Sequence, residues 1–142
     1  MKTLKVVIRP AQQSDCVACQ RLGRVPEIAI APGWYLPLRY YQRLVGRKNI
    51  FLVAEVNRKV IGFVIAEKIE AGFLGQYLVV SNTYRRQGIG LKLLAAIEPI
   101  AKKRGAYFLL GYAVAKSKGM QAALKRLGYH RGQLTYEWGK GL

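Results

Sequence analysis

Three apolar runs lie close together in the middle of the chain and constrain its fold more than any other feature. They cover Ile50 to Val56, Val60 to Ala66 and Phe73 to Val80. Runs rich in β-branched and aromatic residues, separated by short polar or glycine-containing breaks, are typical of consecutive β-strands. The first break is the tripeptide Asn57-Arg58-Lys59, which fits a hairpin. We therefore expect an antiparallel meander at the centre of the fold.

Strand and helix patterns alternate on either side of this meander. The helix after it is marked by apolar residues at helical spacing, namely Ile89, Leu93, Ile97 and Ile100. The other elements are expected as strands at Leu4 to Arg9, Tyr107 to Val114 and Gln133 to Trp138, and as helices from Ser14 towards Leu22, at Leu38 to Val45 and at Ser117 to Leu127. The predicted order is βααβββαβαβ, a mixed α/β fold.

Length and hydrophobicity fit one folded domain. The chain has 142 residues, of which 51% are hydrophobic, so a disordered basic tail is excluded. We expect a single domain over residues 1–142. The longest apolar run, Gly72 to Val80, contains Gln76 and is far shorter than the ~18–20 residues of a membrane span. Met1 to Pro10 lacks the apolar core of a signal peptide, so we expect a cytoplasmic protein without a membrane partner.

The chain is strongly basic. It has 24 Lys plus Arg against 7 Asp plus Glu, a formal net charge of +17. This charge favours an anionic ligand such as a phosphate, an acidic protein or a nucleic acid, although a solvated surface explains it too. Because no recognition-helix or RNA-binding signature is present, nucleic acid is expected only as a nonspecific polyanion.

The soft metal ligands are few. Cys16 and Cys19 have C-x-x-C spacing, but no second cysteine pair exists and His130 is the only histidine. A structural zinc site needs four ligands, so we expect no metal and interpret the two cysteines as buried thiols on a helix.

The segment from Leu78 to Gly90 carries the clearest chemical signal. A strand there runs into a basic loop that opens a helix. The free N–H groups at a helix start bind phosphates, and Gly88 and Gly90 let a ligand approach closely. Arg85-Arg86-Gln87 adds charged and neutral donors. The segment is neither a P-loop nor a dinucleotide fingerprint, and a generic helix start with solvated arginines is the alternative.

This segment resembles the cofactor loop of the GNAT superfamily of acetyl-CoA-dependent N-acetyltransferases. That loop has the pattern Arg/Gln-x-x-Gly-x-Gly/Ala, and Arg85-Arg86-Gln87-Gly88-Ile89-Gly90 matches every defined position. Leu78-Val79-Val80 and Tyr84 resemble the usual lead-in, and Gly128-Tyr129 resembles the pair that follows the last helix. The predicted element order also matches the family over nearly the whole chain.

The resemblance implies a GNAT-like fold, with a mostly antiparallel sheet, a splayed fourth and fifth strand, and helices on both faces. The opening between those strands admits the pantetheine arm of acetyl-CoA, whose amides pair with the backbone of Leu78, Val79 and Val80. The pyrophosphate is expected on the amides of Arg86 to Gly90. The implied enzyme is an acyltransferase that joins acetyl-CoA and an amine in a ternary complex.

The catalytic residues usual in this family are missing. Relatives often carry Glu or His at the strand positions that hold Leu74 and Gln76 here, and a Tyr acid where this chain has Leu124. Neither Leu nor Gln accepts a proton at neutral pH.

Three weak candidates for catalysis remain. Gln76 can order a water that deprotonates the amine, and Tyr112 can serve as the acid. Ser117, also expected to contact the cofactor, can donate a hydrogen bond to the departing sulfur. Positioning of the two substrates and polarisation of the thioester carbonyl can by themselves provide much of the reduction in the activation barrier. A slow or catalytically idle acyl-CoA-binding protein stays open as an alternative.

The acceptor is left open between a small amine, a peptide N-terminus and a protein lysine. Relatives form one wall of the acceptor site at the position of the aromatics Trp34, Tyr35, Tyr40 and Tyr41, of which we expect at least two to pack in the core. Glu67 and Glu70 end a strand, and either one can face the amine or lie in solvent. Similar proteins are often dimers, so a homodimer is possible.

Overall fold

The computed structural model describes residues 4–26, 33–113, 117–133, 135–136 and 138–142. Two compact units divide the chain, a larger one over Met1–Tyr112 and a smaller one over Ala113–Leu142. The expectation of a single domain over residues 1–142 stays a prediction. Within the described residues, no helix has both the length and the hydrophobicity to cross a membrane.

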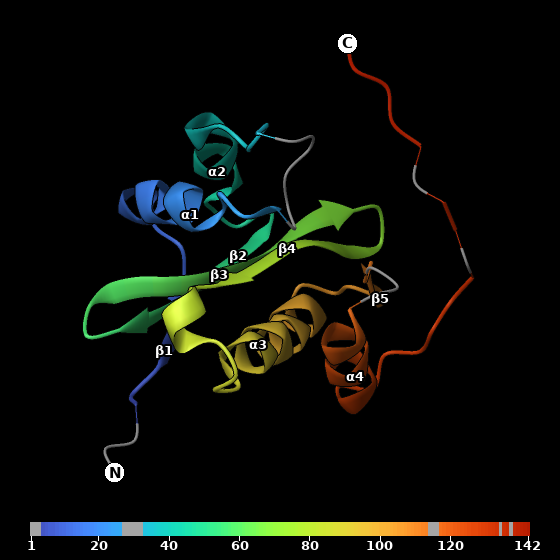
Figure 1. Ribbon diagram of the computed structural model, residues 1–142. Helices are drawn as coiled ribbons and strands as arrows, with labels where there is room; N and C mark the ends of the chain where they lie inside the picture. Colours follow the sequence, from blue (N-terminus) through green and yellow to red (C-terminus); the bar gives the residue numbers. More distant parts are fainter. Residues whose placement is uncertain (1–3, 27–32, 114–116, 134, 137) are drawn as a thin grey trace. The chain divides into compact units, whose positions relative to one another are not determined.

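The larger unit is built on a five-stranded sheet with the strand order β1-β2-β3-β4-β5 (Figure 1). Its strands are β1 Val7–Pro10, β2 Ile50–Val56, β3 Lys59–Ile69, β4 Gly72–Val80 and β5 Phe108–Gly111. The first four pair antiparallel with their neighbours, whereas β4 and β5 are parallel. The predicted meander and the mixed, mostly antiparallel sheet are confirmed.

Helices cover both faces of this sheet, as the family resemblance implied (Figure 1). One face is covered by α1, Cys16–Leu22, and α2, Leu38–Leu44, and the other by α3, Ile89–Lys103. Two short 3-10 turns, η1 at Gln13–Asp15 and η3 at Asn82–Tyr84, precede α1 and α3.

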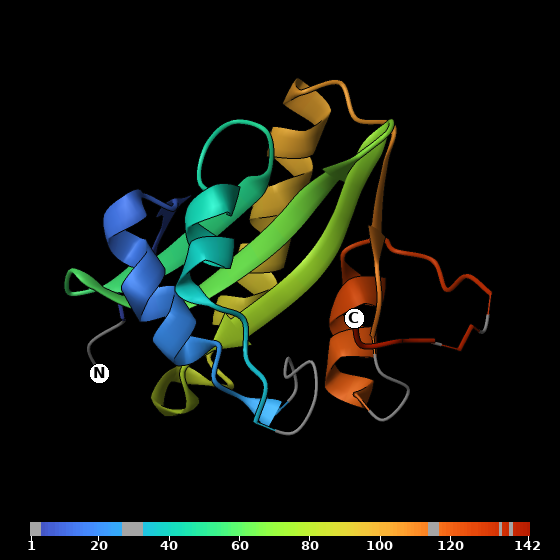
Figure 2. The same cartoon turned by 90° about the horizontal axis from the view of Figure 1, so that it is seen from above.

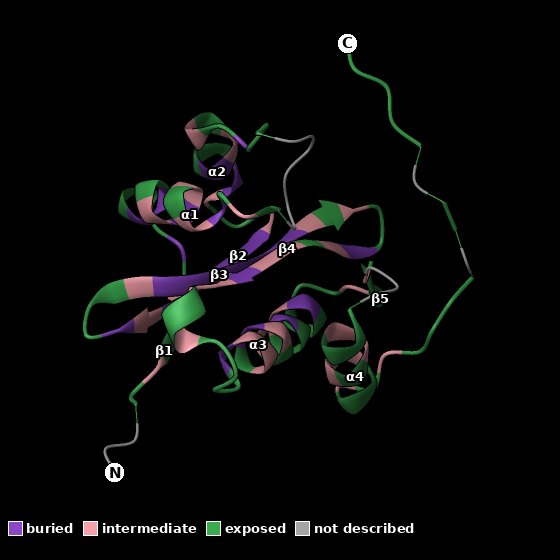
Figure 3. Cartoon of the chain, viewed as in Figure 1, coloured by how far each residue is buried: buried purple, intermediate pink, exposed green. Residues whose placement is uncertain are grey.

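Two separate apolar cores hold the helices to the sheet. The buried side of α3 presents Ile89, Leu93, Ile97 and Ala101, whose spacing places them on one helix face. On the opposite face of the sheet, Tyr41 of α2 packs edge-on against Phe63 of β3, with ring centroids 5.7 Å apart. Figure 3 shows this burial along the central strands and on the inner sides of the helices.

The smaller unit contains α4, Lys118–Arg126, with Ser117 at its N-cap. The predicted last strand, Gln133 to Trp138, requires a correction, because none of its described residues lies in a strand. Leu134 and Glu137 lie outside the described residues. An isolated strand is unstable without a ladder partner, and here the apolar side chains of Tyr136 and Trp138 are 79% and 92% exposed. The fifth strand is also shorter than predicted, and Val114 at its expected end lies outside the described residues.

Candidate active site

A β-bulge interrupts β4 at Gln76. The register of β3 and β4 pairs Ile65 with Tyr77 and Ala66 with Gly75, which leaves Gln76 as one extra residue. The extra residue changes which side chains point to which face. Phe73, before the bulge, packs in the α3 core, whereas Val79, after it, packs with α1 and α2. In a regular strand these two odd-numbered residues would share a face.

The bulge marks the point where β5 leaves β4. The parallel ladder runs from Gly72 opposite Phe108 to Gly75 opposite Gly111 and ends there. Beyond it, the described partner of residues 76–80 in the sheet is β3 alone. Figure 2 shows β4 and β5 diverging over this stretch. The predicted splay of the fourth and fifth strands is confirmed.

The open edge exposes a defined set of backbone groups. Ser81 N–H donates to the carbonyl of Ile61 on β3 at 2.8 Å. Because bonding direction alternates along an antiparallel strand, Val79 also directs its N–H and C=O towards β3. Leu78 and Val80 therefore direct theirs to the side from which β5 has departed. The sequence prediction grouped Leu78, Val79 and Val80 together, and the register separates Val79 from the other two.

The start of α3 lies immediately beyond this edge. Gly88 is the N-cap and has a left-handed backbone with φ of 77°. Arg86 has φ of 62°, which is uncommon for a residue with a Cβ. No side chain caps the first turn, so the N–H groups of Ile89 and Gly90 remain available at the positive end of the helix.

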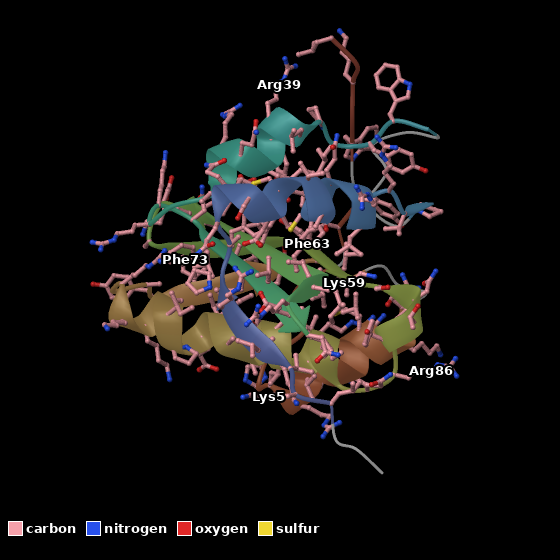
Figure 4. All side chains as sticks on the ribbon, turned by 90° about the vertical axis from the view of Figure 1, so that its left-hand side faces the viewer. Lys5, Arg39, Lys59, Phe63, Phe73 and Arg86 are labelled. Carbon is pink, nitrogen blue, oxygen red and sulfur yellow. The ribbon has the colours of Figure 1, made fainter. Side chains whose placement is uncertain are left out.

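Arg85 connects the loop to the strand. Its Nε donates a hydrogen bond of 3.0 Å to the carbonyl oxygen of Val80. Arg86 and Gln87 are exposed, and Figure 4 shows Arg86 pointing away from the sheet. The arrangement holds the Arg85 guanidinium against the strand end and leaves the Arg86 guanidinium exposed beside the helix start.

The two loop glycines have different roles. A Cβ added to Gly88 would meet nothing within 4 Å, so its need for glycine is conformational and its outer side is open. A Cβ added to Gly90 would lie 3.7 Å from Leu78 Cδ2 and 3.8 Å from Val80 Cγ2. A Cβ at position 90 would therefore make ordinary van der Waals contacts with β4 and would face the strand rather than open space.

Sequence reasoning named Tyr40 and Glu67 separately but missed that they touch. The Tyr40 hydroxyl on α2 donates a hydrogen bond of 2.7 Å to Glu67 Oε1 on β3. The Tyr40 ring also lies edge-on to Tyr41 and Tyr77, at centroid distances of 5.6 and 6.0 Å. Burial and the hydrogen-bonded Glu67 carboxylate raise the pKa of Tyr40 well above its usual value, so the phenol stays protonated.

The neighbouring aromatics divide as expected between core and surface. Tyr41 is buried and Tyr40 packs partly buried beside it, so the prediction that at least two of the four pack in the core is confirmed. Trp34 is 69% exposed, and Tyr35 is exposed as well.

Comparison with known proteins identifies the family. The family model described as Acetyltransferase (GNAT) domain matches residues 47–131. An uncharacterized N-acetyltransferase from Methanocaldococcus jannaschii is 31% identical over 108 residues, covering 70% of this chain and 47% of that protein. The chain belongs to the GNAT acetyltransferase family. It spans about half the length of this curated relative.

Solved GNAT structures share the fold. The ribosomal-protein-S18-alanine N-acetyltransferase of Escherichia coli aligns with a TM-score of 0.76 at 20% identity, covering 91% of this chain and 80% of that one. An aminoglycoside N-acetyltransferase in complex with CoA aligns with a TM-score of 0.75 at 15% identity, covering 98% and 97%. The GNAT family consists of acyltransferase enzymes, and the element order through α4 follows its fold.

The catalytic candidates of this GNAT chain belong to different elements, and their shared role stays a prediction. Gln76 is exposed at the bulge, and Tyr112 follows β5 with 73% of its surface exposed. Ser117 belongs to the smaller unit, where its side chain makes no capping bond. Leu124 lies in the same unit. In the described part of the chain, no group of three or more His, Cys, Asp or Glu is arranged to hold a metal ion.

Proposed function

We propose that this GNAT chain transfers the acetyl group of acetyl-CoA to a primary amine in a ternary complex. One observation carries the proposal: the open edge of β4 leads directly into the uncapped N-terminus of α3. A strand edge suits the amides of a pantetheine arm, and a helix start suits a pyrophosphate. The adjacency of the two along the chain matches a ligand that contains both groups in sequence.

The cofactor contacts follow from the backbone directions. Leu78 and Val80 would pair with the pantetheine amides, and Val79 would contribute packing on the opposite face. The amides from Gln87 to Gly90 would surround the pyrophosphate. Arg86 would add a charge-assisted hydrogen bond, whereas Arg85 would chiefly hold the loop against Val80.

The chemical step needs little covalent participation from the protein. A neutral amine attacks the thioester carbonyl carbon, the carbon–sulfur bond breaks, and an amide forms. The amine loses one proton and the departing thiolate gains one. Gln76 would order the water that takes the proton, and Tyr112 or Ser117 would supply the proton to sulfur. Orientation and polarisation of the carbonyl would provide most of the rate enhancement.

A second candidate function is acyl-CoA binding without turnover. It is favoured by Leu74 and Gln76, which occupy the strand positions where relatives often carry a proton acceptor. This alternative shares the cofactor site and differs only in the absence of acetyl transfer.

A calorimetric titration with acetyl-CoA tests the site. The variant Arg86→Glu reverses a charge at the start of α3, and Lys103→Glu makes the same change at the exposed far end of the helix. We expect saturable one-site binding that Arg86→Glu weakens at least about tenfold and Lys103→Glu leaves unchanged. The absence of saturable binding to the wild type would overturn the proposal.

Release of free CoA thiol with a panel of amines then separates the two functions. Small amines, a peptide with a free N-terminus and a lysine peptide represent the three acceptor classes. Thiol release that depends on an amine supports acetyl transfer, and binding without release with every class supports the acyl-CoA-binding alternative.

A further inference from the structure

Of the five side-chain carboxylates in the described part of the chain, three are paired with cations, whereas Glu67 and the exposed Glu70 are not. Asp15 and Glu55 each lie 2.7 Å from the guanidinium of Arg9, and Glu98 lies 3.2 Å from Lys102 Nζ. Glu67 differs, because among the described residues its recorded partner is the neutral hydroxyl of Tyr40. Its negative charge is therefore not neutralised by a side chain of the described part, in a protein whose formal net charge is +17.

Glu67 lies beside the bulge and on a particular face of the sheet. It pairs in register with Leu74, two residues before Gln76. Side chains alternate along β3, and Phe63 and Ile65 pack with α1 and α2, so Glu67 points to that same face. The hydrogen bond from Tyr40 confirms this direction, because α2 packs on the same face of the sheet. The carboxylate thus lies close to where β5 leaves the sheet.

The surroundings of Glu67 suit a positively charged ligand. The Tyr40 hydroxyl occupies Oε1, which leaves Oε2 as an acceptor. The rings of Tyr40 and Tyr77 stand edge-on to one another at 6.0 Å and add aromatic surface, which attracts cations. Contacts with two neighbouring rings and with Glu67 fix the Tyr40 side chain, so the carboxylate is held in place before a ligand arrives.

We infer that the Tyr40–Glu67 pair holds a cationic group of the acceptor, so that the acceptor carries a positive charge in addition to the neutral amine that attacks the thioester. The inference rests on the acetyl transfer proposed above and adds the chemical class of the acceptor. Glu67 is a positioning residue here, since it binds the acceptor's charge and takes no part in proton transfer. The rest of the basic surface repels such a ligand, so a local carboxylate decides where it docks.

Binding of cadaverine, a small dication, to the CoA-saturated protein tests the pair, with uncharged pentanediol as the comparison. The variant Glu67→Gln removes the charge and keeps an acceptor oxygen for Tyr40. Glu70→Gln is the matched control, because Glu70 is an exposed residue at the turn after β3. We expect cadaverine to bind about tenfold more weakly to Glu67→Gln, and the Glu70→Gln variant to behave as the wild type.

The outcomes are distinct from those of the cofactor site. Equal cadaverine binding to the wild type and Glu67→Gln, or no cadaverine binding to the wild type, would overturn the inference. Glu67→Gln must bind acetyl-CoA as the wild type does, and a separate titration of acetyl-CoA without amine measures this. Failure of that titration in the wild type would overturn the proposed function, and with it the identification of the bound cation as an acceptor. Cadaverine binding to the free protein would then test separately whether Glu67 holds a cation. Tyr40→Phe keeps the ring, and we expect it to weaken cadaverine binding about threefold by freeing the carboxylate to rotate.

Discussion

Arg85 Nε donates a 3.0 Å hydrogen bond to the carbonyl oxygen of Val80, five residues earlier in the chain. The side chain thereby closes the loop between β4 and α3 onto the end of its own strand. The motif alone presents Arg85 as a phosphate ligand, but its hydrogen bond also holds the start of α3 at a fixed spacing from the end of β4, the two halves of the proposed cofactor site.

Arg85→Ala should weaken acetyl-CoA binding about tenfold, because it removes a charge and releases the loop from Val80. Arg85→Lys restores the charge but lacks the Nε donor in its fork geometry, so we expect an affinity between those of the wild type and the alanine variant. Calorimetric titration measures both. Full recovery in Arg85→Lys would show that charge alone matters at this position.

Arg86→Gly should raise stability while lowering acetyl-CoA affinity. Arg86 has φ of 62°, a conformation that costs a residue with a Cβ about 1 kcal/mol and glycine almost nothing. Urea denaturation should report a gain of that size. Arg86→Ala is the control, because it loses the same charge and keeps the strained backbone. A gain in stability for Arg86→Ala as well would attribute the effect to charge.

Gly72→Ala should disrupt the pairing of β4 with β5. A Cβ at Gly72 would lie 2.5 Å from the carbonyl oxygen of Phe108, so the strands must move apart at a cost of about 2 kcal/mol or more. Gly75→Ala serves as the comparison in the same ladder, since its Cβ would lie 3.7 Å from the Leu110 oxygen. Thermal unfolding should separate the two variants, and similar melting temperatures would contradict the prediction.

The Arg9–Asp15 ion pair should make stability fall in acid. Hydrogen bonds from Arg9 lower the pKa of the Asp15 carboxyl below its unfolded value of about 3.9. A depressed folded pKa gives stability that is fully present above the unfolded value and is lost as pH falls through the folded value. Asp15→Asn should cost about 3 kcal/mol at neutral pH, because the Asp15 side chain is buried. Its stability should also vary less than that of the wild type from about pH 5 downward, as denaturation at each pH will show.

The two cysteines should be unreactive in the folded protein. Both are buried, and burial raises the pKa of Cys19 to about 12. The thiolate is the reactive form, so an aromatic disulfide reagent at mildly alkaline pH should label the native protein slowly and the denatured protein at once. Rapid labelling of the native protein would place at least one thiol at the surface.

The sequence predicted the elements whose pattern is local. The meander and α3 follow from runs and spacings that short segments encode, and the family motif located the start of α3. The Tyr40–Glu67 contact spans 27 residues and depends on which face of α2 turns towards β3. Tyr40 and Tyr41 are adjacent and chemically alike, so no local pattern says which of them meets a carboxylate. The prediction of a last strand at Gln133 to Trp138 was wrong for a related reason, because strand-like composition does not show whether a neighbouring strand is available for pairing.

The single extra residue at Gln76 allows Phe73 and Val79 to pack on opposite faces of β4, whereas a regular strand would place both on the same face. Deleting Gln76 would return the strand to one continuous alternation, and either Phe73 or Val79 would then have to leave its core. A change of one residue in length here would therefore move every side chain on one side of the bulge to the opposite face of the sheet. The fold should therefore accept other side chains at position 76, where the proposed catalytic role is a separate constraint, but it should require the same number of residues between Gly72 and Val80.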